Sequence, residues 1–132
     1  MEPLEQPQKI VSYRDLKVWQ KGMDLVELTY DLACKLPPSE KYGLAAQMCR
    51  AAVSIPSNIA EGWGRKHRAE YINHLSMANG SLKELETQIL ICIRLRQIQE
   101  TDAEQAPSLA EEVGRMLAVL IQKLRAKAPR PR

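Results

Sequence analysis

The 132-residue chain contains no phenylalanine, and aromatic residues make up only 5% of it. It has no run of roughly eighteen or more apolar residues, and its start lacks the basic, apolar and small-residue order of a secretory signal. We therefore expect neither a membrane-spanning helix nor a signal peptide, and we expect a cytoplasmic protein. The 45% apolar composition still suffices for one core in a single domain.

Cysteines are few and poorly spaced for chemistry. The chain has three cysteines, Cys34, Cys49 and Cys92. Zinc sites usually use closely spaced pairs such as CxxC, which are absent, and disulfide frameworks usually contain an even number of cysteines. Each cysteine stands in an apolar helical context, so we expect three reduced thiols in the core. The sequence predicts no metal and no cofactor.

Apolar residues recur three and four positions apart over most of the chain, a spacing typical of amphipathic helices. We expect four helices, at about residues 15–36, from 39 to between 62 and 64, at 67–98, and from 103 or 107 to 127. Ser39 is the expected N-cap of the second helix, and Pro56 inside that helix predicts a kink near Ala52. The sequence therefore indicates an all-α protein.

The linkers between these helices are short, which forces consecutive helices to run antiparallel. This predicts an up-down-up-down four-helix bundle without strands. Pro3 and Pro7 interrupt the segment before the first helix. We therefore divide the chain into a flexible N-terminal arm at residues 1–12, a four-helix bundle domain at residues 13–127 and a basic C-terminal tail at residues 128–132.

The first expected helix carries two apolar rows. We assign one row to the core of the bundle: Leu16, Trp19, Met23, Val26, Tyr30 and Ala33. The second row makes the apolar stripe wider than one core face requires. We interpret it as an oligomer interface formed by Val18, Leu25, Leu28 and Leu32.

Polar residues recur at helical spacing beside the apolar stripe of the second helix, and the third helix offers a similar row. We name this set the polar seam: Arg50, Ser54, Asn58, Glu61, Ser81 and Glu84. A buried polar group without a partner costs about 1–3 kcal/mol, so such groups occur as hydrogen-bonded networks or stay in water. We interpret the seam as a structural network, and the alternative is a functional site lined by these groups.

Three stretches carry a resemblance to a known family: DLKVWQKGMDLVELTYDL, QMCRAAVSIPSNIAEGWGR and YINHLSMANGSLKELETQI. Over about residues 13–124 the chain resembles the four-helix bundle proteins named after the 23S ribosomal RNA intervening sequences that encode some of them. The resemblance implies a homopentamer without known catalytic activity, similar in fold to the accessory variability determinant of diversity-generating retroelements. The chain departs from the family at His74, where an aromatic residue is usual, and at Asn79, where a basic one is.

Positive charge is concentrated near the C-terminus. The formal net charge is +3, yet the last ten residues hold five basic side chains and no acid, which leaves fourteen basic and sixteen acidic residues elsewhere. In an up-down-up-down bundle the start of the first helix, the turn after the second and the end of the fourth share one end. We name this end the basic pole, and it should gather Lys9, Arg14, Lys17, Arg65, Lys66, Arg68, Lys123, Arg125, Lys127, Arg130 and Arg132.

The basic pole has two interpretations. Lys and Arg near a helix C-terminus interact favourably with the helix dipole and improve solubility, without any partner. Alternatively, clustered cations bind phosphate backbones, and cyclic symmetry would multiply the cluster into a ring. We expect binding of structured RNA, or of DNA, without sequence readout, because only Trp63 and Tyr13 stand near the pole as stacking groups.

Groups that would support catalysis or metal binding are sparse, so we expect no enzyme activity. His67, Glu70 and His74 share one helix face, but a single helix supplies too few metal ligands. The glutamates lack a nucleophile beside them, and the GWGRK turn at residues 62–66 lacks the spacing of a phosphate-binding loop. We therefore expect a nucleic-acid-binding accessory protein. The alternative is an interaction scaffold, for example an accessory subunit of a reverse transcriptase or another RNA-handling partner.

Overall fold

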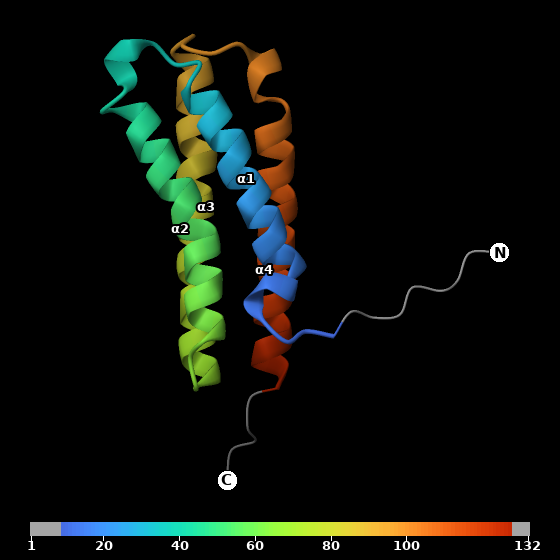
Figure 1. The fold of residues 1–132 in the computed structure, drawn as a ribbon. Helices are drawn as coiled ribbons and strands as arrows, with labels where there is room; N and C mark the ends of the chain where they lie inside the picture. Colours follow the sequence, from blue (N-terminus) through green and yellow to red (C-terminus); the bar gives the residue numbers. More distant parts are fainter. Residues whose placement is uncertain (1–8, 128–132) are drawn as a thin grey trace, which may run out of the picture.

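The computed structural model describes residues 9–127, and within this range every regular element is a helix. The four α-helices are α1 (Lys17–Ala33), α2 (Leu44–Trp63), α3 (Arg68–Arg94) and α4 (Gln105–Ala126). Short 3₁₀ helices precede three of them: η1 (Tyr13–Asp15), η2 (Pro38–Glu40) and η3 (Glu100–Ala103). Figure 1 shows the α-helices side by side with alternating direction, which confirms the predicted all-α four-helix fold. None of the described helices is long and apolar enough to cross a membrane.

The start of α1 differs from the predicted one because a local cap intervenes. The Ser12 hydroxyl accepts a hydrogen bond from the Arg14 N–H, and the Asp15 carboxylate accepts one from the Ser12 N–H. This capping box closes η1 as a separate turn. Leu16 then adopts an extended backbone (φ −74°, ψ 124°), so α1 begins at Lys17 and not at Asp15.

Two further helix ends were predicted wrongly. Ser39 lies inside η2, and Gly43 takes a backbone conformation outside the helical region (φ −107°, ψ −117°), so α2 begins only at Leu44. At the end of α3, Arg96 has a left-handed backbone (φ 59°), and the Gln97 N–H donates to the Cys92 carbonyl over 2.9 Å. This arrangement ends α3 well before the predicted residue 98.

Pro56 is buried within α2, and the helix continues through it. Figure 1 shows α2 bending in its N-terminal half, as an interior proline predicts. Gly22 of α1 faces this proline, since a Cβ at Gly22 would lie 3.6 Å from the Pro56 Cβ. α1 and α2 therefore lie close together at this level, and a Cβ at Gly22 would make ordinary van der Waals contacts.

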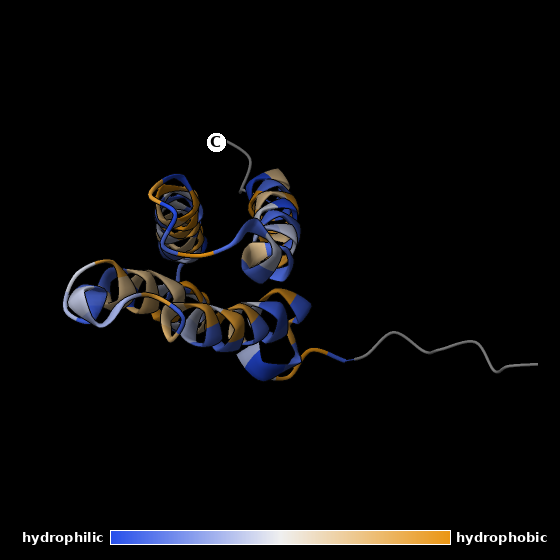
Figure 2. Ribbon diagram, turned by 90° about the horizontal axis from the view of Figure 1, so that it is seen from above, coloured by the Kyte–Doolittle hydropathy of each residue, from blue (hydrophilic) through white to orange (hydrophobic). Residues whose placement is uncertain are grey.

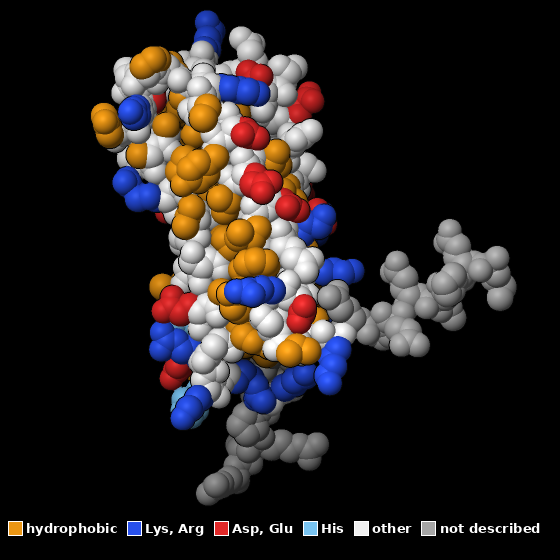
Figure 3. Space-filling model, in the orientation of Figure 1, with side chains coloured by type: hydrophobic (Ala, Val, Ile, Leu, Met, Phe, Trp, Pro, Cys, Tyr) orange, Lys and Arg blue, Asp and Glu red, His pale blue; other side chains and the backbone are white. Residues whose placement is uncertain are grey.

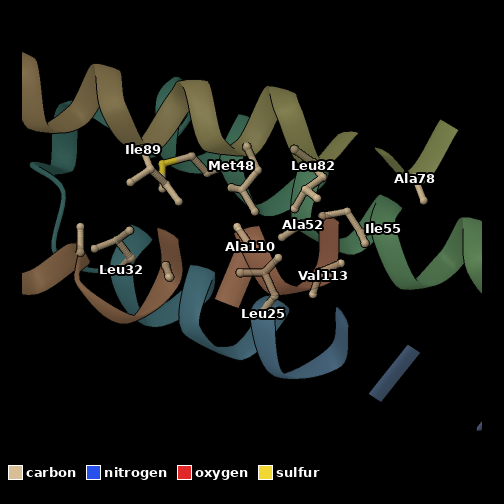
Figure 4. Close-up of a cluster of buried hydrophobic side chains, with 14 of the residues drawn as sticks. Leu25, Leu32, Met48, Ala52, Ile55, Ala78, Leu82, Ile89, Ala110 and Val113 are labelled. Carbon is tan, nitrogen blue, oxygen red and sulfur yellow. The ribbon is translucent and has the colours of Figure 1, made fainter. Parts of the chain in front are cut away.

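The core runs along the bundle and receives side chains from all four α-helices. Leu25, Ile55, Leu82 and Val113, one from each, are fully buried, and Figure 4 shows the core side chains gathered between the helices. Figure 2, seen from above, shows hydrophobic and hydrophilic residues distributed around each helix, as expected for amphipathic helices. The bundle therefore holds its surface residues on a rigid frame.

The row of α1 predicted as an oligomer interface lies in the core, and the row predicted as core is right only in part, since Leu16, Trp19 and Val26 pack against the core. The inward row, predicted as an oligomer interface, consists of Val18 (5% exposed), Leu25 (0%) and Leu32 (2%). Leu28, predicted to join that interface, is half-buried against the same core. Met23 and Tyr30, predicted as core, are 42% and 48% exposed. Gly22, which lies on the inward face, is buried against Pro56 and Ile55 of α2.

The prediction of three core thiols is right for Cys92 alone. Cys92 is buried, and its thiol donates to the Met48 sulfur over 3.6 Å. Burial raises the pKa of this thiol. Cys49 is half-buried, and Cys34 is exposed because it follows the last turn of α1.

Candidate functional site

One end of the bundle gathers three segments that are far apart in the sequence. The start of α1, the turn between α2 and α3 and the end of α4 all lie there (Figure 1). Figure 3 shows Lys and Arg side chains concentrated at this end. The described residues of the predicted basic pole are Lys9, Arg14, Lys17, Arg65, Lys66, Arg68, Lys123, Arg125 and Lys127. Arg130 and Arg132 lie outside the described residues.

Two arginines of the pole already have partners. The Arg65 Nη2 lies 3.0 Å from the Glu61 Oε1, in an ion pair between residues four positions apart in the sequence. The Arg14 guanidinium stands 5.6 Å from the centre of the Tyr13 ring, in cation–π geometry. Both side chains remain exposed, but a phosphate would have to compete for Arg65 with its carboxylate partner.

Arg68 occupies an intermediate position, since it is half-buried and its Nη1 is shielded from solvent without a hydrogen-bond partner in the described structure. Lysines of the pole are freer. Lys17, Lys66, Lys123 and Lys127 are exposed, and the ion pairs found among residues 9–127 do not involve them. Lys9 and Arg125 are likewise exposed and outside those ion pairs, so six cations of the pole can meet a phosphate backbone without breaking an ion pair.

The aromatic residues near the pole pack against each other. Trp63 and Tyr71 meet edge to face with ring centres 6.2 Å apart, and Tyr13 meets Trp19 in the same way at 5.4 Å. Burial raises the pKa of the Tyr71 phenol. The predicted stacking groups Trp63 and Tyr13 are half-buried and pack against other rings. They therefore stabilise the packing at this end of the bundle.

The polar seam between α2 and α3 is a chain of hydrogen bonds. The Ser54 Oγ lies 2.6 Å from the Ser81 Oγ, and the Asn58 amide donates to the Ser54 carbonyl over 2.9 Å and to its Oγ over 3.1 Å. The His74 Nδ1 lies 3.2 Å from the Asn58 Oδ1. Four polar side chains thus satisfy one another beside the core.

The other three predicted seam residues are not in this chain of hydrogen bonds. Glu61 lies three residues after Asn58, on a part of α2 that faces solvent, so it is exposed. Its carboxylate pairs with Arg65. Arg50 and Glu84 are exposed and line a hollow of about 310 Å³ beside the seam. Glu84 accepts a hydrogen bond from Gln88, and no ion pair joins it to Arg50 in the described structure.

His74 is the seam residue that sequence reasoning missed. Its spacing from His67 and Glu70 marks it as a weak metal candidate, but its ring turns into the α2–α3 seam. Residues 9–127 hold no group of three or more His, Cys, Asp or Glu that could bind a metal ion. The signal was present in the spacing, because His74 precedes Ser81 by two helical turns and therefore shares its face.

Removing the amide of Asn58 should destabilise the fold. In Asn58→Leu the Ser54 hydroxyl and the His74 ring lose a partner, so we expect the free energy of unfolding to fall by about 1–3 kcal/mol. Glu61→Ala removes only an exposed ion pair and should change it by less than about 1 kcal/mol. Urea denaturation followed by circular dichroism measures both. Equal losses of unfolding free energy in the two variants would indicate that Glu61 belongs to the network.

An apolar face covers α1 and α2 on the surface that Figure 3 shows. We name it the α1–α2 apolar face, and it consists of Met23, Tyr30, Ala33, Cys34, Ala45, Ala46, Cys49 and Val53. Tyr30 and Cys49 line a hollow of about 490 Å³ within it, and Lys41 is the charged residue of that lining. Large contiguous apolar patches on protein surfaces are typical of association sites, so this face is a candidate for one.

Comparisons with known proteins agree with the fold. Residues 14–119 match the family model described as 23S rRNA-intervening sequence protein. A solved structure of a Bacteroides thetaiotaomicron protein, of unknown function and from the S23 ribosomal protein family, is 25% identical to the chain with a TM-score of 0.74. That match covers 80% of this chain and 95% of the other. A search of curated proteins found no match.

Proposed function

The chain belongs to the 23S rRNA-intervening sequence protein family, and from that premise we propose that it is a non-enzymatic, oligomeric accessory protein that binds structured RNA through its basic pole. The observation that supports this function is the meeting of cations from three distant segments at one end of the bundle. A one-sided cluster of Lys and Arg is the electrostatic footprint of a phosphate-binding surface. Of the acids at this end, Asp15 is occupied by a cap and Glu61 by an ion pair, whereas Glu70 in the first turn of α3 is exposed and outside the ion pairs of the described residues.

Binding would proceed by exchange of ions. Each phosphate that a lysine neutralises releases condensed counterions from the RNA, and this release supplies most of the affinity. The free lysines stand on different elements, Lys17 at the start of α1, Lys66 in the α2–α3 turn and Lys123 near the end of α4. The bundle holds these elements together, so the three charges meet one RNA surface. Phosphate contacts of this kind carry no sequence preference.

We infer that the protein associates with itself through the α1–α2 apolar face. Met23, Tyr30 and Val53 expose two-fifths or more of their surface there, which favours burial against a second copy. Five copies are the number that the family resemblance implies. A cyclic assembly would present several basic poles to one RNA, and the linked contacts would raise the affinity far above that of one subunit.

Neutralising free lysines of the pole tests RNA binding. The variant Lys66→Gln, Lys123→Gln and Lys127→Gln should weaken binding of a structured ribosomal RNA fragment. It should also reduce the slope of log affinity against log salt by about 0.7–0.9 for each phosphate that the variant no longer neutralises. Fluorescence anisotropy over a salt series measures both quantities. The three residues are exposed and unpaired in the described structure, so folding should be unaffected.

The matched control removes three charges from the opposite end of the bundle. Lys35→Gln, Arg94→Gln and Arg96→Gln should leave affinity and salt slope nearly unchanged. Lys35 loses only an exposed ion pair with Asp102, and glutamine at position 96 must adopt the same left-handed backbone as arginine does. Equal losses from the two ends would contradict a localised pole.

The second candidate function is a protein interaction scaffold, and the α1–α2 apolar face is the observation that favours it. In that case the face would dock an RNA-handling partner such as a reverse transcriptase. The unaltered protein would then show no RNA or DNA binding of its own at low salt.

A further inference from the structure

A groove lies between the first turn of α1 and the last turns of α4, beside the basic pole. Its volume is about 400 Å³, and its charged lining residues are Lys17, Arg115 and Lys123. The rest of the lining is apolar and consists of Leu16, Val18, Met116, Val119 and Leu120. We name it the α1–α4 groove.

The apolar lining of the groove matches an aliphatic side chain better than a nucleotide. Leu16, Met116 and Leu120 are half-buried against the core, whereas Val119 exposes 49% of its surface. Covering such surface with an apolar group is favourable by about 25 cal/mol per Å². The described lining contains no aromatic ring on which a base could stack and no amide that could read a base edge. The groove is therefore built to hold protein side chains.

Cations reach the groove from both helices, and its described lining contains no acid. Lys17 of α1 and Lys123 of α4 have no ion pair within residues 9–127, and the first turn of α1 holds no acidic residue. Farther from the pole, the same two helices are joined by an ion pair, in which the Lys21 Nζ lies 3.8 Å from the Glu112 Oε1. The groove is thus a stretch of the α1–α4 boundary where the complementary acids are missing from the described chain.

The length of the groove suits two turns of a bound helix. From Arg115 to Lys123, α4 rises about 12 Å at about 1.5 Å per residue. Apolar side chains at positions i, i+3 or i+4, and i+7 of a docked helix span about 10.5 Å at the same rise. Acidic residues beside such a stripe would reach the lysines on the two sides of the groove.

We propose that the α1–α4 groove docks an acidic amphipathic helix of a partner protein. The apolar stripe of that helix packs on Met116 and Val119, and its carboxylates pair with Lys17 and Lys123. Charge complementarity selects this occupant, because it supplies both the apolar cover and the acids that the groove lacks. The inference goes beyond RNA binding and does not depend on it. Since Lys17 and Lys123 also belong to the basic pole, a docked helix would occupy two of its free cations.

Binding of a synthetic peptide to the full chain tests the occupant. The probe is a fluorescent helical peptide of about fifteen residues, with leucines at i, i+4 and i+7 and glutamates on both sides of that stripe. We expect saturable binding in fluorescence anisotropy, with a Kd below about 1 mM. Replacing its leucines by serine should weaken binding at least about tenfold. Binding that survives this replacement, or no saturable binding of the parent peptide, overturns the proposal.

A substitution in the groove locates the peptide. Val119→Asp places a carboxylate on the apolar lining, so it should weaken peptide binding at least about tenfold. Val53→Asp is the matched control, because Val53 is 41% exposed on α2, in the α1–α2 apolar face. The control should change the affinity per subunit by less than about twofold. Circular dichroism checks that both variants fold. Equal losses would place the peptide on the α1–α2 apolar face and overturn the proposal.

A pair of lysine substitutions tests the charges without touching the apolar lining. Lys17→Gln with Lys123→Gln should weaken peptide binding about threefold to tenfold, the range set by two exposed ion pairs. Lys66→Gln with Lys127→Gln removes the same charge from the same pole, outside the groove lining. This control pair should have less than about a twofold effect. Equal losses would mean that the peptide responds only to net charge, which overturns the proposal.

The structured RNA fragment separates the two kinds of partner. If Val119→Asp and the pair Lys17→Gln with Lys123→Gln weaken RNA binding but leave peptide affinity unchanged, the groove belongs to the RNA surface and the docking proposal is overturned. If the unaltered protein binds the peptide in the groove and binds no RNA, the docking proposal stands and the RNA function does not.

Discussion

If the protein associates through the α1–α2 apolar face as proposed, Tyr30→Asp combined with Val53→Asp is expected to yield monomers. Both side chains are about half exposed in the isolated subunit, so the carboxylates would be solvated in the monomer and its core would keep its packing. At a subunit interface each carboxylate would lose its water, at a free-energy cost of several kcal/mol without a partner. Size-exclusion chromatography with light scattering measures the change in mass.

Met77→Asp with Leu90→Asp is the matched control. These two apolar side chains are also at least half exposed, but they lie on α3, away from the α1–α2 apolar face. The control variant should keep the mass of the unaltered protein. A monomeric unaltered protein would remove self-association altogether, and dissociation by the control pair would move the interface to α3.

Gly62→Ala should lower the free energy of unfolding by about 1–3 kcal/mol, the range for overpacking in a filled site. A Cβ at Gly62 would lie 2.7 Å from the His74 Cβ, 2.9 Å from the Tyr71 Cδ1 and 3.3 Å from the Tyr71 carbonyl oxygen. The Cβ and the carbonyl belong to the frame of α3 and cannot move aside as a flexible side-chain end would. The two helices must therefore separate at this level.

Gly80→Ala is the control with the opposite sign. It makes the same chemical change inside α3, but a Cβ there meets no atom within 4 Å. Alanine loses less backbone entropy than glycine in a helix, so we expect a gain of about 0.5–1 kcal/mol. Urea denaturation of both variants under one condition gives the comparison. Stabilisation by both alanines would contradict the close contact at Gly62.

The existence of the four helices could be read from the sequence, but the inward face of α1 could not. Periodicity identifies rows of apolar residues without stating which row meets the neighbouring helices. Gly22 and Thr29 share the face of Leu25, and both look unlike core residues in the sequence. Gly22 is buried against Pro56 of α2, and Thr29 is buried because its hydroxyl donates to the Leu25 carbonyl over 2.7 Å.

The candidate site divides in a similar way. Topology alone predicted which segments meet at the basic pole, because the alternation of short-linked helices fixes which ends coincide. The sequence predicted the partners and burial of these cations only in part. The pairing of Arg65 with Glu61 was readable from their spacing of four, whereas the burial of the Arg68 Nη1 depends on packing that no local pattern records.

The polar seam has a consequence for the handedness of the bundle. A chain of four helices with short turns can wind around its axis in either of two mirror-related orders, and both bury similar apolar stripes. In the opposite winding, α1 and α3 would exchange sides on α2. Ser54 and Asn58 would then face the apolar row of α1 that contains Leu25, where the Thr29 hydroxyl already donates to a backbone carbonyl. The seam between Ser54, Asn58 and Ser81 therefore favours the observed winding over the opposite one.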